Sequence, residues 1–303
     1  MSHSTNDFFA AIDPVVNRSY YGLDDEGNAP EKQYSTIFKV SSDSEPQMSS
    51  VEYGGPASLT LKDENAAVTP KHIKQGPVKT YFTSTYAGAI TISIEAAKDV
   101  KNRYGKIAQA SQALGEAERI TPELLTAQLL DGAFSTATFA TADGIAICGT
   151  HVLPDTVTTS ANFLATPAAF DEASAEDVRV ALRGTLGPSG NIRPLKTVAW
   201  VVPSAYEPLA TKLSSSPKTL GSANNDPSVV KGTSVKVFDY LSSSTRWFAE
   251  TNAKENGLFW HWIEKPQFIT DQVVLMLQKV YVSYFRARYG IVDWRHIYGS
   301  NAT

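Results

Sequence analysis

The chain has 303 residues, of which 42% are hydrophobic and 19% charged, enough for one or two globular domains with a sizeable core. Its 27 basic and 31 acidic residues give a net charge of −4, which argues against a dedicated nucleic-acid-binding protein because such proteins usually carry a basic surplus. The sequence also predicts no membrane span, no secretory signal and, with Cys148 as its single cysteine, no intramolecular disulfide.

Charge is distributed unevenly along the chain. Residues 1–50 carry eight acidic and three basic side chains, residues 62–106 carry eight basic and four acidic ones, and residues 271–303 carry four basic and two acidic ones. Opposite charges on separate segments suit docking between copies of a chain, since complementary patches fix partner and register. A solvated, weakly structured N-terminus explains the acidic segment equally well.

The N-terminal third predicts an arm followed by a hairpin. The first 50 residues are polar, interrupted by prolines and without periodicity, which favours an extended arm. We expect Ser58–Leu61 and Val78–Thr85 to form the strands of a long hairpin with the polar segment Lys62–Lys74 at its tip. Such a ribbon has few apolar side chains and is marginal unless it lies on another surface.

A long helical segment follows the hairpin. Ser93 is a plausible N-cap, and apolar residues spaced by three or four continue to Leu114, which predicts an amphipathic helix. Thr121 and Pro122 are typical of a new helix start, so we expect a second helix to about Phe134. Together the two helices would form a two-part spine.

Residues 141–240 read as an α/β unit, and the rest of the chain as strands. The predicted elements are a helix opening at Ser174–Asp177, a strand at Thr197–Val202, a short helix after Pro203, a loop at 214–232 and a strand at Ser234–Tyr240. An aromatic stretch at 247–262 precedes a long strand predicted for Gln272–Tyr289.

Few residues suggest chemistry. The sequence has no nucleotide-binding, serine-hydrolase or zinc motif. Cys148 and His151 could be a nucleophile and its base or half a metal site, or a buried thiol beside a loop histidine. The run Asp293–His296 is either an acid/base cluster or a structural charge pair, and the aromatic stretch is either a ligand box or core. We predict no enzymatic activity, cofactor or metal.

The order of these parts resembles the Hong Kong 97-type tailed-phage major capsid proteins, with features of Mu-like head subunits. Local similarity lies in four segments, together spread over roughly residues 50–300: Tyr86–Glu95, Thr141–Asn162, Leu195–Pro203 and Tyr284–Tyr298. The resemblance implies an α+β fold with an N-terminal arm (1–50), an E-loop hairpin (51–92), a peripheral domain (93–140 and 245–303) and an inserted axial domain (141–244).

The resemblance also implies a function. Such subunits assemble as hexamers and pentamers into an icosahedral shell that encloses double-stranded DNA, in the virion and after assembly in the host cytoplasm. Partners would be other copies of the chain, with separate scaffolding, portal and decoration proteins possible and no membrane. The E-loop would lie on a neighbouring subunit, with Lys62, Asp63, Glu64, Lys71 and Lys74 as its contact residues.

One departure from the family concerns crosslinking. The type member joins an E-loop lysine to an asparagine with the help of a glutamate, but Gln272–Tyr289 contains neither Asn nor Glu. Val274 and Tyr281 stand where those residues are expected. Lys62, Lys71 and Lys74 remain candidate donors without an acceptor there, and Asn252 and Asn256 are the first alternative acceptors.

Two other functions remain open at this point. An encapsulin, a cellular compartment that encloses an enzyme, would share the same fold. A cytosolic hydrolase that uses Cys148 and His151 would belong to a different class of protein.

Overall fold

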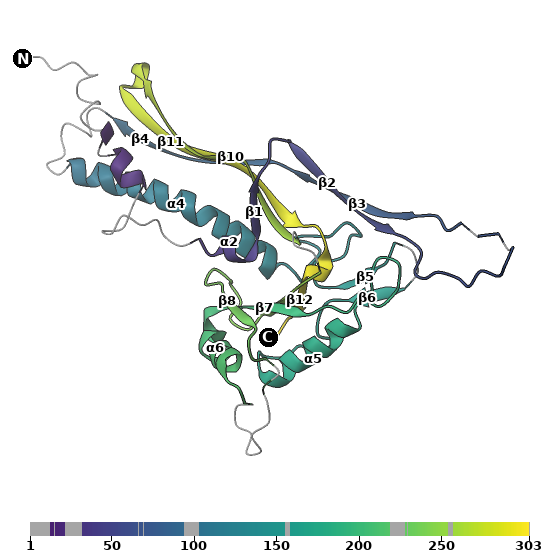
Figure 1. Ribbon diagram of the computed structural model, residues 1–303. Helices are drawn as coiled ribbons and strands as arrows, with labels where there is room; N and C mark the ends of the chain where they lie inside the picture. Colours follow the sequence, from purple (N-terminus) through teal and green to yellow (C-terminus); the bar gives the residue numbers. More distant parts are fainter. Residues whose placement is uncertain are drawn as a thin grey trace, which may run out of the picture.

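The computed structural model describes residues 13–14, 16–21, 32–65, 67–68, 70–93, 103–154, 158–218, 228, 230–253 and 257–302, without the side chains of 103–106 and 274. Residues 1–12, 15 and 22–31 of the predicted N-terminal arm, the predicted helix segment 94–102, much of the loop 214–232 and Asn256 therefore lie outside the described residues. A long helix runs alongside a long sheet, and a smaller α/β unit lies beside them. A hairpin projects from the region where the sheet and the smaller unit meet (Figure 1).

The long sheet has four strands in the order β1-β10-β11-β4. Its two central strands are antiparallel and are joined by the short 3₁₀ turn η2 (Val274–Met276), so the single strand predicted across Gln272–Tyr289 is wrong at this turn. Leu277 adopts a positive φ of 50°, which closes the turn. The strands are β1 (Lys39–Ser42), β4 (Ser84–Ser93), β10 (Leu258–Val273) and β11 (Gln278–Ile291).

Helix α4 (Arg103–Asp131) lies along this sheet as one continuous helix. The predicted restart at Thr121 is wrong, because the helix passes through Pro122 and the Thr121 hydroxyl donates to the carbonyl of Ala117 at 2.6 Å rather than capping a new helix. Burial of the apolar face that follows offsets the hydrogen bond that proline cannot make. Ser93 ends β4 opposite Gln278, and the predicted helix start after it lies outside the described residues, so its role as a cap stays a prediction.

The smaller unit is built on a second four-stranded sheet in the order β12-β9-β7-β8. The predicted strand Thr197–Val202 is confirmed as β7, and the predicted helix begins slightly earlier, where Asp171 caps α5 and Ser174 completes a capping box. The other elements are α5 (Glu172–Arg183), η1 (Ser204–Tyr206), α6 (Glu207–Ser215), β8 (Ser234–Val237), β9 (Trp247–Thr251), η3 (Trp294–His296) and β12 (Ile297–Ser300).

Two cores lie on opposite faces of this second sheet. Trp200 and Trp247 point into a core with α5 and α6, whereas Val201 and Phe248 join the core under α4 and the long sheet. Both faces are therefore covered, which explains why β7 reads as an unbroken apolar run. The aromatic stretch 247–262 supplies core residues, so its interpretation as core is confirmed.

The strand pairing bears on the predicted domain division. β9 and β12 fall within the range predicted to be peripheral, yet β9 pairs with β7 of the predicted axial domain and β12 pairs with β9 in the same sheet. A boundary at residue 245 therefore does not separate the two sheets. The division into peripheral and axial domains stays a prediction.

The projecting hairpin consists of β2 (Gln47–Gly54) and β3 (Lys74–Phe82), while a second small hairpin pairs β5 (Thr150–Val152) with β6 (Thr159–Ala161). The strand predicted at Ser58–Leu61 is wrong, because these residues lie in the tip. The predicted strand Val78–Thr85 is divided between β3 and β4. The hairpin thus begins inside the predicted arm.

The described part of that arm is folded against its own subunit rather than extended. Residues 16–21 are helical, and the short helix α2 (Tyr34–Ile37) leads into β1. Tyr34, Ile37 and Phe38 are buried in the core beside α4. Three closely spaced apolar side chains in a polar segment explain this packing.

No helix within the described ranges is long and apolar enough to cross a membrane.

A buried asparagine ties the smaller hairpin to the end of the chain. The amide nitrogen of Asn162 lies within 2.8–3.0 Å of the carbonyl oxygens of Ile147, Trp294 and Ile297, and its oxygen accepts from the Gly149 N–H at 2.8 Å. Asn162 is itself buried, so water has little access to replace these hydrogen bonds if its side chain is removed.

We predict that Asn162→Ala lowers the free energy of unfolding by about 3 kcal/mol, because several buried backbone groups lose their partner at once. Chemical denaturation of the unassembled subunit measures the change. Asn191→Ala, at an exposed position, should change it by less than about 0.5 kcal/mol. Equal effects in the two variants would show that the Asn162 side chain has no special role.

Candidate assembly surfaces

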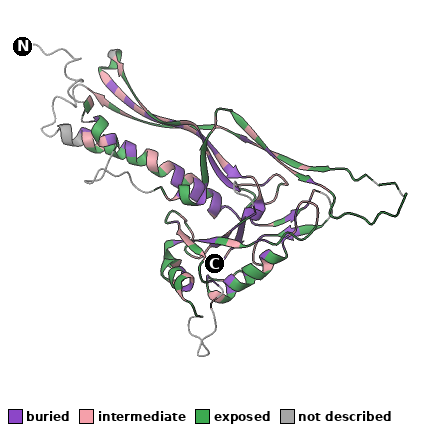
Figure 2. Ribbon diagram, in the orientation of Figure 1, coloured by how far each residue is buried: buried purple, intermediate pink, exposed green. Residues whose placement is uncertain are grey.

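The tip of the projecting hairpin is fully solvent-exposed. The five predicted contact residues are exposed in the subunit: Lys62, Asp63, Glu64, Lys71 and Lys74. Within the tip, the Lys71 ammonium donates to the Ser58 carbonyl at 3.2 Å. Figure 2 shows the distal hairpin extending beyond the body of the molecule, coloured as exposed. The structure therefore brings the predicted residues together on one free projection.

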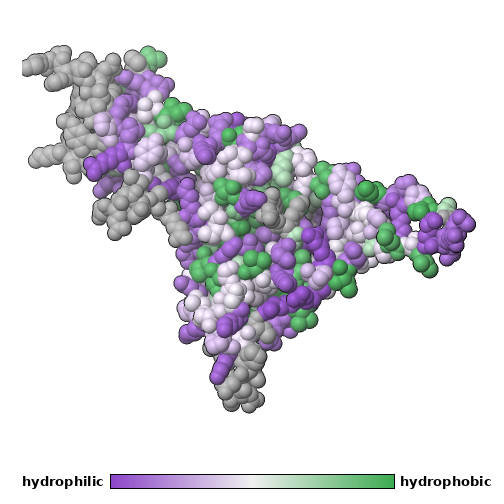
Figure 3. Space-filling model, viewed as in Figure 1, coloured by the Kyte–Doolittle hydropathy of each residue, from purple (hydrophilic) through white to green (hydrophobic). Residues whose placement is uncertain are grey.

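The same tip carries apolar side chains that the sequence analysis treated as part of a polar loop. Leu59 and Leu61 are 95% and 96% exposed, and Val68 and Ile73 are also largely exposed. Hydrophobic groups are visible along the projection in Figure 3. The signal was present in the alternation of Leu59 and Leu61, which is typical of a ribbon with one apolar face.

The base of the hairpin, in contrast, is firmly held. The Tyr81 hydroxyl donates to the Ile291 carbonyl, and its ring lies over Gly290, where an added Cβ would be 2.4 Å from the ring. The ring of Phe259 meets Tyr81 edge-on at 5.0 Å. The Lys79 ammonium donates to the Ala140 carbonyl at 2.9 Å. Together these contacts fix the base while the tip remains free.

Buried charges add to this anchor. The Arg288 and Arg295 side chains are almost fully buried. Arg288 pairs with Asp43, which precedes β2, and Arg295 pairs with Glu52, which lies within β2. Burial raises the pKa of Glu52, and this effect outweighs the opposing charge of Arg295. For Asp43, the Glu45 N–H and the Arg288 guanidinium outweigh desolvation and lower the pKa of the carboxyl.

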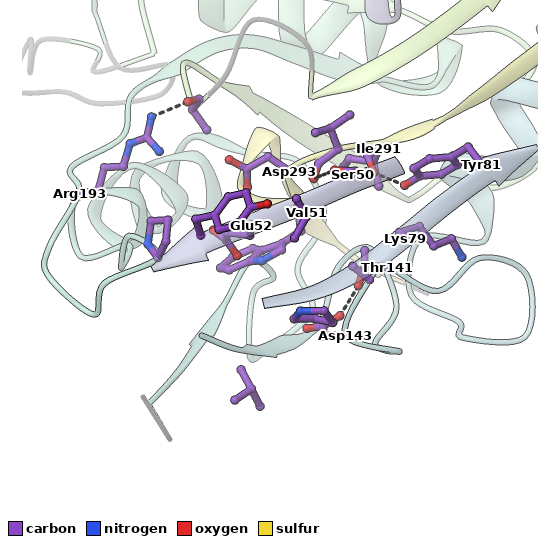
Figure 4. Close-up of a pocket in the computed structure, with 18 residues that line it drawn as sticks. Ser50, Val51, Glu52, Lys79, Tyr81, Thr141, Asp143, Arg193, Ile291 and Asp293 are labelled. Carbon is purple, nitrogen blue, oxygen red and sulfur yellow. Dashed lines mark hydrogen bonds between the residues drawn. The ribbon is translucent and has the colours of Figure 1, made fainter. Parts of the chain in front are cut away.

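A cavity of about 420 Å³ lies beside the hairpin base. Figure 4 shows its labelled residues coming from the hairpin, the 141–143 loop and the end of β11, with Arg193 hydrogen-bonded at one side to the Ala253 carbonyl. Charged groups of both signs line it. Among the described residues no three potential metal ligands cluster.

The Cys148–His151 pair is structural in this fold. His151 Nδ1 lies 2.8 Å from the Asp143 carboxylate and Nε2 lies 3.2 Å from the Ile147 carbonyl, while the ring stacks on Trp294 at 4.3 Å. Burial raises the pKa of the Cys148 thiol, which disfavours the thiolate. With both imidazole nitrogens engaged and the thiol buried, the hydrolase alternative loses its basis.

The Asp293–His296 run is also structural. The Asp293 carboxylate accepts from the Arg295 N–H at 3.1 Å and caps η3, and it also pairs with the Arg295 guanidinium. The interpretation as a charge pair is therefore favoured over an acid/base cluster.

Two of the described acidic residues of the arm, Asp13 and Asp43, are paired within the chain. The Lys279 ammonium lies 2.5 Å from the Asp13 carboxylate, and Asp43 pairs with Arg288. The Tyr20 hydroxyl lies 2.7 Å from that of Ser283 and donates to the half-buried carboxyl of Glu118. These two acidic side chains therefore pair with basic residues of β11 in their own subunit, while the predicted complementarity between neighbouring copies stays a prediction.

Comparison with known proteins identifies the family. The family described as phage capsid protein matches residues 77–300. This chain belongs to the phage capsid protein family. A comparison with curated proteins found no match.

The fold is shared with several solved capsids. The chain is similar to the capsid of Myoviridae phage XM1 (TM-score 0.56, 11% identity, covering 94% of this chain and 98% of that one). It is also similar to the capsid of the empty GTA particle, with a TM-score of 0.55 and 14% identity, covering 91% of this chain and 92% of that one. The capsid of cyanophage P-SCSP1u gives a TM-score of 0.55 and 12% identity, covering 93% of this chain and 92% of that one.

The predicted identity as a Hong Kong 97-type phage major capsid protein is therefore confirmed, and so is the α+β capsid fold. Its function is structural, and it acts by assembling with copies of itself into a capsid. The encapsulin alternative is less supported, because the matching family is that of phage capsid proteins.

The buried Asp143 carboxylate gives the capsid subunit a pH-dependent contribution to stability. Burial raises the pKa of Asp143, but hydrogen bonds from His151 and Thr141 outweigh it and bring the pKa to about 2. A lowered pKa stabilises the folded state above the ordinary value near 3.8, and this stabilisation is lost as the pH falls towards 2.

We predict that Asp143→Asn lowers the free energy of unfolding by about 2 kcal/mol at pH 7. The difference from wild type should narrow steadily between pH 5 and pH 3, as measured by urea denaturation of the unassembled subunit. The exposed Asp63→Asn serves as a control with no such dependence. A difference that stays constant over this range would contradict the assignment.

Proposed function

We propose that the chain is the major subunit of an icosahedral phage shell, in which its copies form hexamers and pentamers around double-stranded DNA. The observation that carries this proposal is the hairpin tip, residues 55–73, in which the described apolar and charged side chains are exposed in their own subunit. An exposed apolar ribbon on a firmly held base suits a contact with a neighbouring copy.

In this proposal the tip lies on the adjacent subunit. Lys62, Asp63, Glu64, Lys71 and Lys74 set the register through charge, because both signs occur on the tip. The apolar side chains supply the free energy, since a large apolar side chain contributes about 1.5–3 kcal/mol when it is fully buried.

The same proposal covers the remaining partners. Scaffolding, portal and decoration proteins would be separate chains, and assembly would take place in the host cytoplasm before the shell becomes part of the virion. The subunit would have no catalytic role and no cofactor. Residues 93–140 and 245–303 would act as the peripheral domain and 141–244 as the axial domain, with β9 and β12 shared between them.

The shell would be held without autocatalytic crosslinks. Tyr281, at one of the two positions where the family's reactive groups are expected, is buried and packs on Phe268. Asn252, an alternative acceptor, has its side-chain oxygen committed to the Lys196 N–H at 2.9 Å. Asn256 lies outside the described residues.

We predict that replacing residues 55–73 by Asn-Gly leaves a folded subunit that forms no shells. Gly54 and Lys74 are paired at the end of the ladder, so a two-residue turn can close it. Circular dichroism and the thermal midpoint should match wild type, while electron microscopy should show no particles.

A second variant, in which residues 56–72 become a Gly/Ser segment of equal length, separates the side chains from the loop length. It should also fail to assemble. Normal shells from either variant would refute the proposed role of the tip, and loss of folding would place the tip in the core.

We further predict that mature particles boiled in detergent run as single chains near 32.8 kDa. Non-covalent contacts dissociate under these conditions, whereas an isopeptide bond survives. A ladder of multimers would reveal a crosslink, and mass spectrometry of the crosslinked peptides would then identify the acceptor. Lys62→Arg, Lys71→Arg and Lys74→Arg, each of which keeps the charge, would test which lysine donates.

A further inference from the structure

A cavity of about 260 Å³ in the smaller unit is lined by basic side chains and by no acidic one. It lies between α5, the start of β7 and the residues just before β8. We call it the basic pocket and define it by its four cationic residues, Arg179, Arg183, Lys196 and Lys231. Nothing in the assembly role derived above uses this cavity.

Three separate elements direct these cations to one place. Arg179 and Arg183 are four residues apart on α5 and therefore lie on the same face of the helix, beside its buried stripe. Lys196 has its backbone fixed by Asn252, which accepts from its N–H at 2.9 Å and donates to its carbonyl at 3.2 Å. Lys231 lies next to Gly232, whose N–H donates to the Ser214 carbonyl at 3.0 Å.

The pocket is electrostatically unbalanced. Over the ranges that the structure describes, none of the four cations forms an ion pair. All four residues are exposed to solvent. Elsewhere in the same part of the chain, Lys236 pairs with Glu250. Like charges one helical turn apart destabilise a helix. The Arg179–Arg183 spacing is therefore a local cost that a bound anion would relieve.

The geometry points to an anion with several oxygens. Guanidinium groups bind phosphate oxygens with two parallel hydrogen bonds, and lysine ammonium groups add point charges. Thr197 and Thr233 also line the cavity and carry hydroxyl donors. One carboxylate would neutralise a single cation, whereas a phosphate carries up to two charges and offers oxygens to groups arriving from several sides.

We propose that the basic pocket binds phosphate groups. Two sources share this chemistry, the backbone of nucleic acid and a soluble polyphosphate. The first source rests on the proposed function, in which the shell encloses DNA, and the second does not. Binding would neutralise the cluster and stabilise the packing of α5 against β7 and β8.

The test uses the full-length protein, with separate titrations of sodium tripolyphosphate and of a 20-base-pair DNA duplex. We expect wild type to bind at least one probe and Arg179→Gln/Arg183→Gln to bind it at least tenfold more weakly. Lys196→Gln/Lys231→Gln, which changes the other side of the cavity, should have a similar effect. For the duplex, the slope of log K against log salt should fall by about 2 for two lost contacts.

The matched control is Lys212→Gln/Lys265→Gln, which removes the same charge from exposed positions outside the pocket and should bind like wild type. Preference for tripolyphosphate or for DNA identifies the source. Absence of binding to both probes, or equal weakening in the control, overturns the proposal. Electron microscopy of the same samples reports shell formation separately, so a missing phosphate site is distinguished from a failure to assemble.

Discussion

The architecture of this subunit depends on how two buried arginines, Arg288 in β11 and Arg295 in η3, hold the base of the hairpin. Arg288 pairs with Asp43 and donates to the Glu45 carbonyl at 2.9 Å, and Arg295 pairs with Glu52 and donates to the Leu186 carbonyl at 2.8 Å. Removing one partner of a buried pair costs about 3–5 kcal/mol because the other charge stays buried. These pairs therefore fix the direction in which the hairpin leaves the body.

A fixed base changes what the exposed tip can do. A tip on a loose tether would lose much conformational entropy when it docked, and this loss would reduce the affinity for a neighbour. Here Tyr81 and Lys79 join the arginines in holding β3, so the strands are ordered before any contact forms. The apolar groups at the tip can then contribute most of their burial free energy to assembly. The cost is an exposed hydrophobic surface on the free subunit.

The sequence predicted the elements with strong local signals and missed those decided by tertiary contacts. The bounds of β7 were predicted correctly from the sequence, because both faces of this strand are buried and its apolar run is therefore continuous. The predicted helix break at Pro122 is wrong because packing of α4 overrides the local preference of proline. The turn at 274–276 was missed because its residues are apolar and look like part of a strand. The tip was predicted as an exposed projection, but the basic pocket could not be found, since its cations are far apart in sequence and meet only in the folded chain.

The pairing of charges inside the subunit limits how subunits can recognise one another. Because Asp13, Asp43 and Glu52 neutralise cations of β11 and η3, they are not available to attract basic segments of a neighbour. Recognition must then use charges that the subunit leaves exposed, and the tip carries both signs within a few residues. A surface of mixed sign gains little from long-range attraction but penalises misregistered contacts. Charge at the tip would therefore select the register, while the free energy of assembly comes from apolar burial.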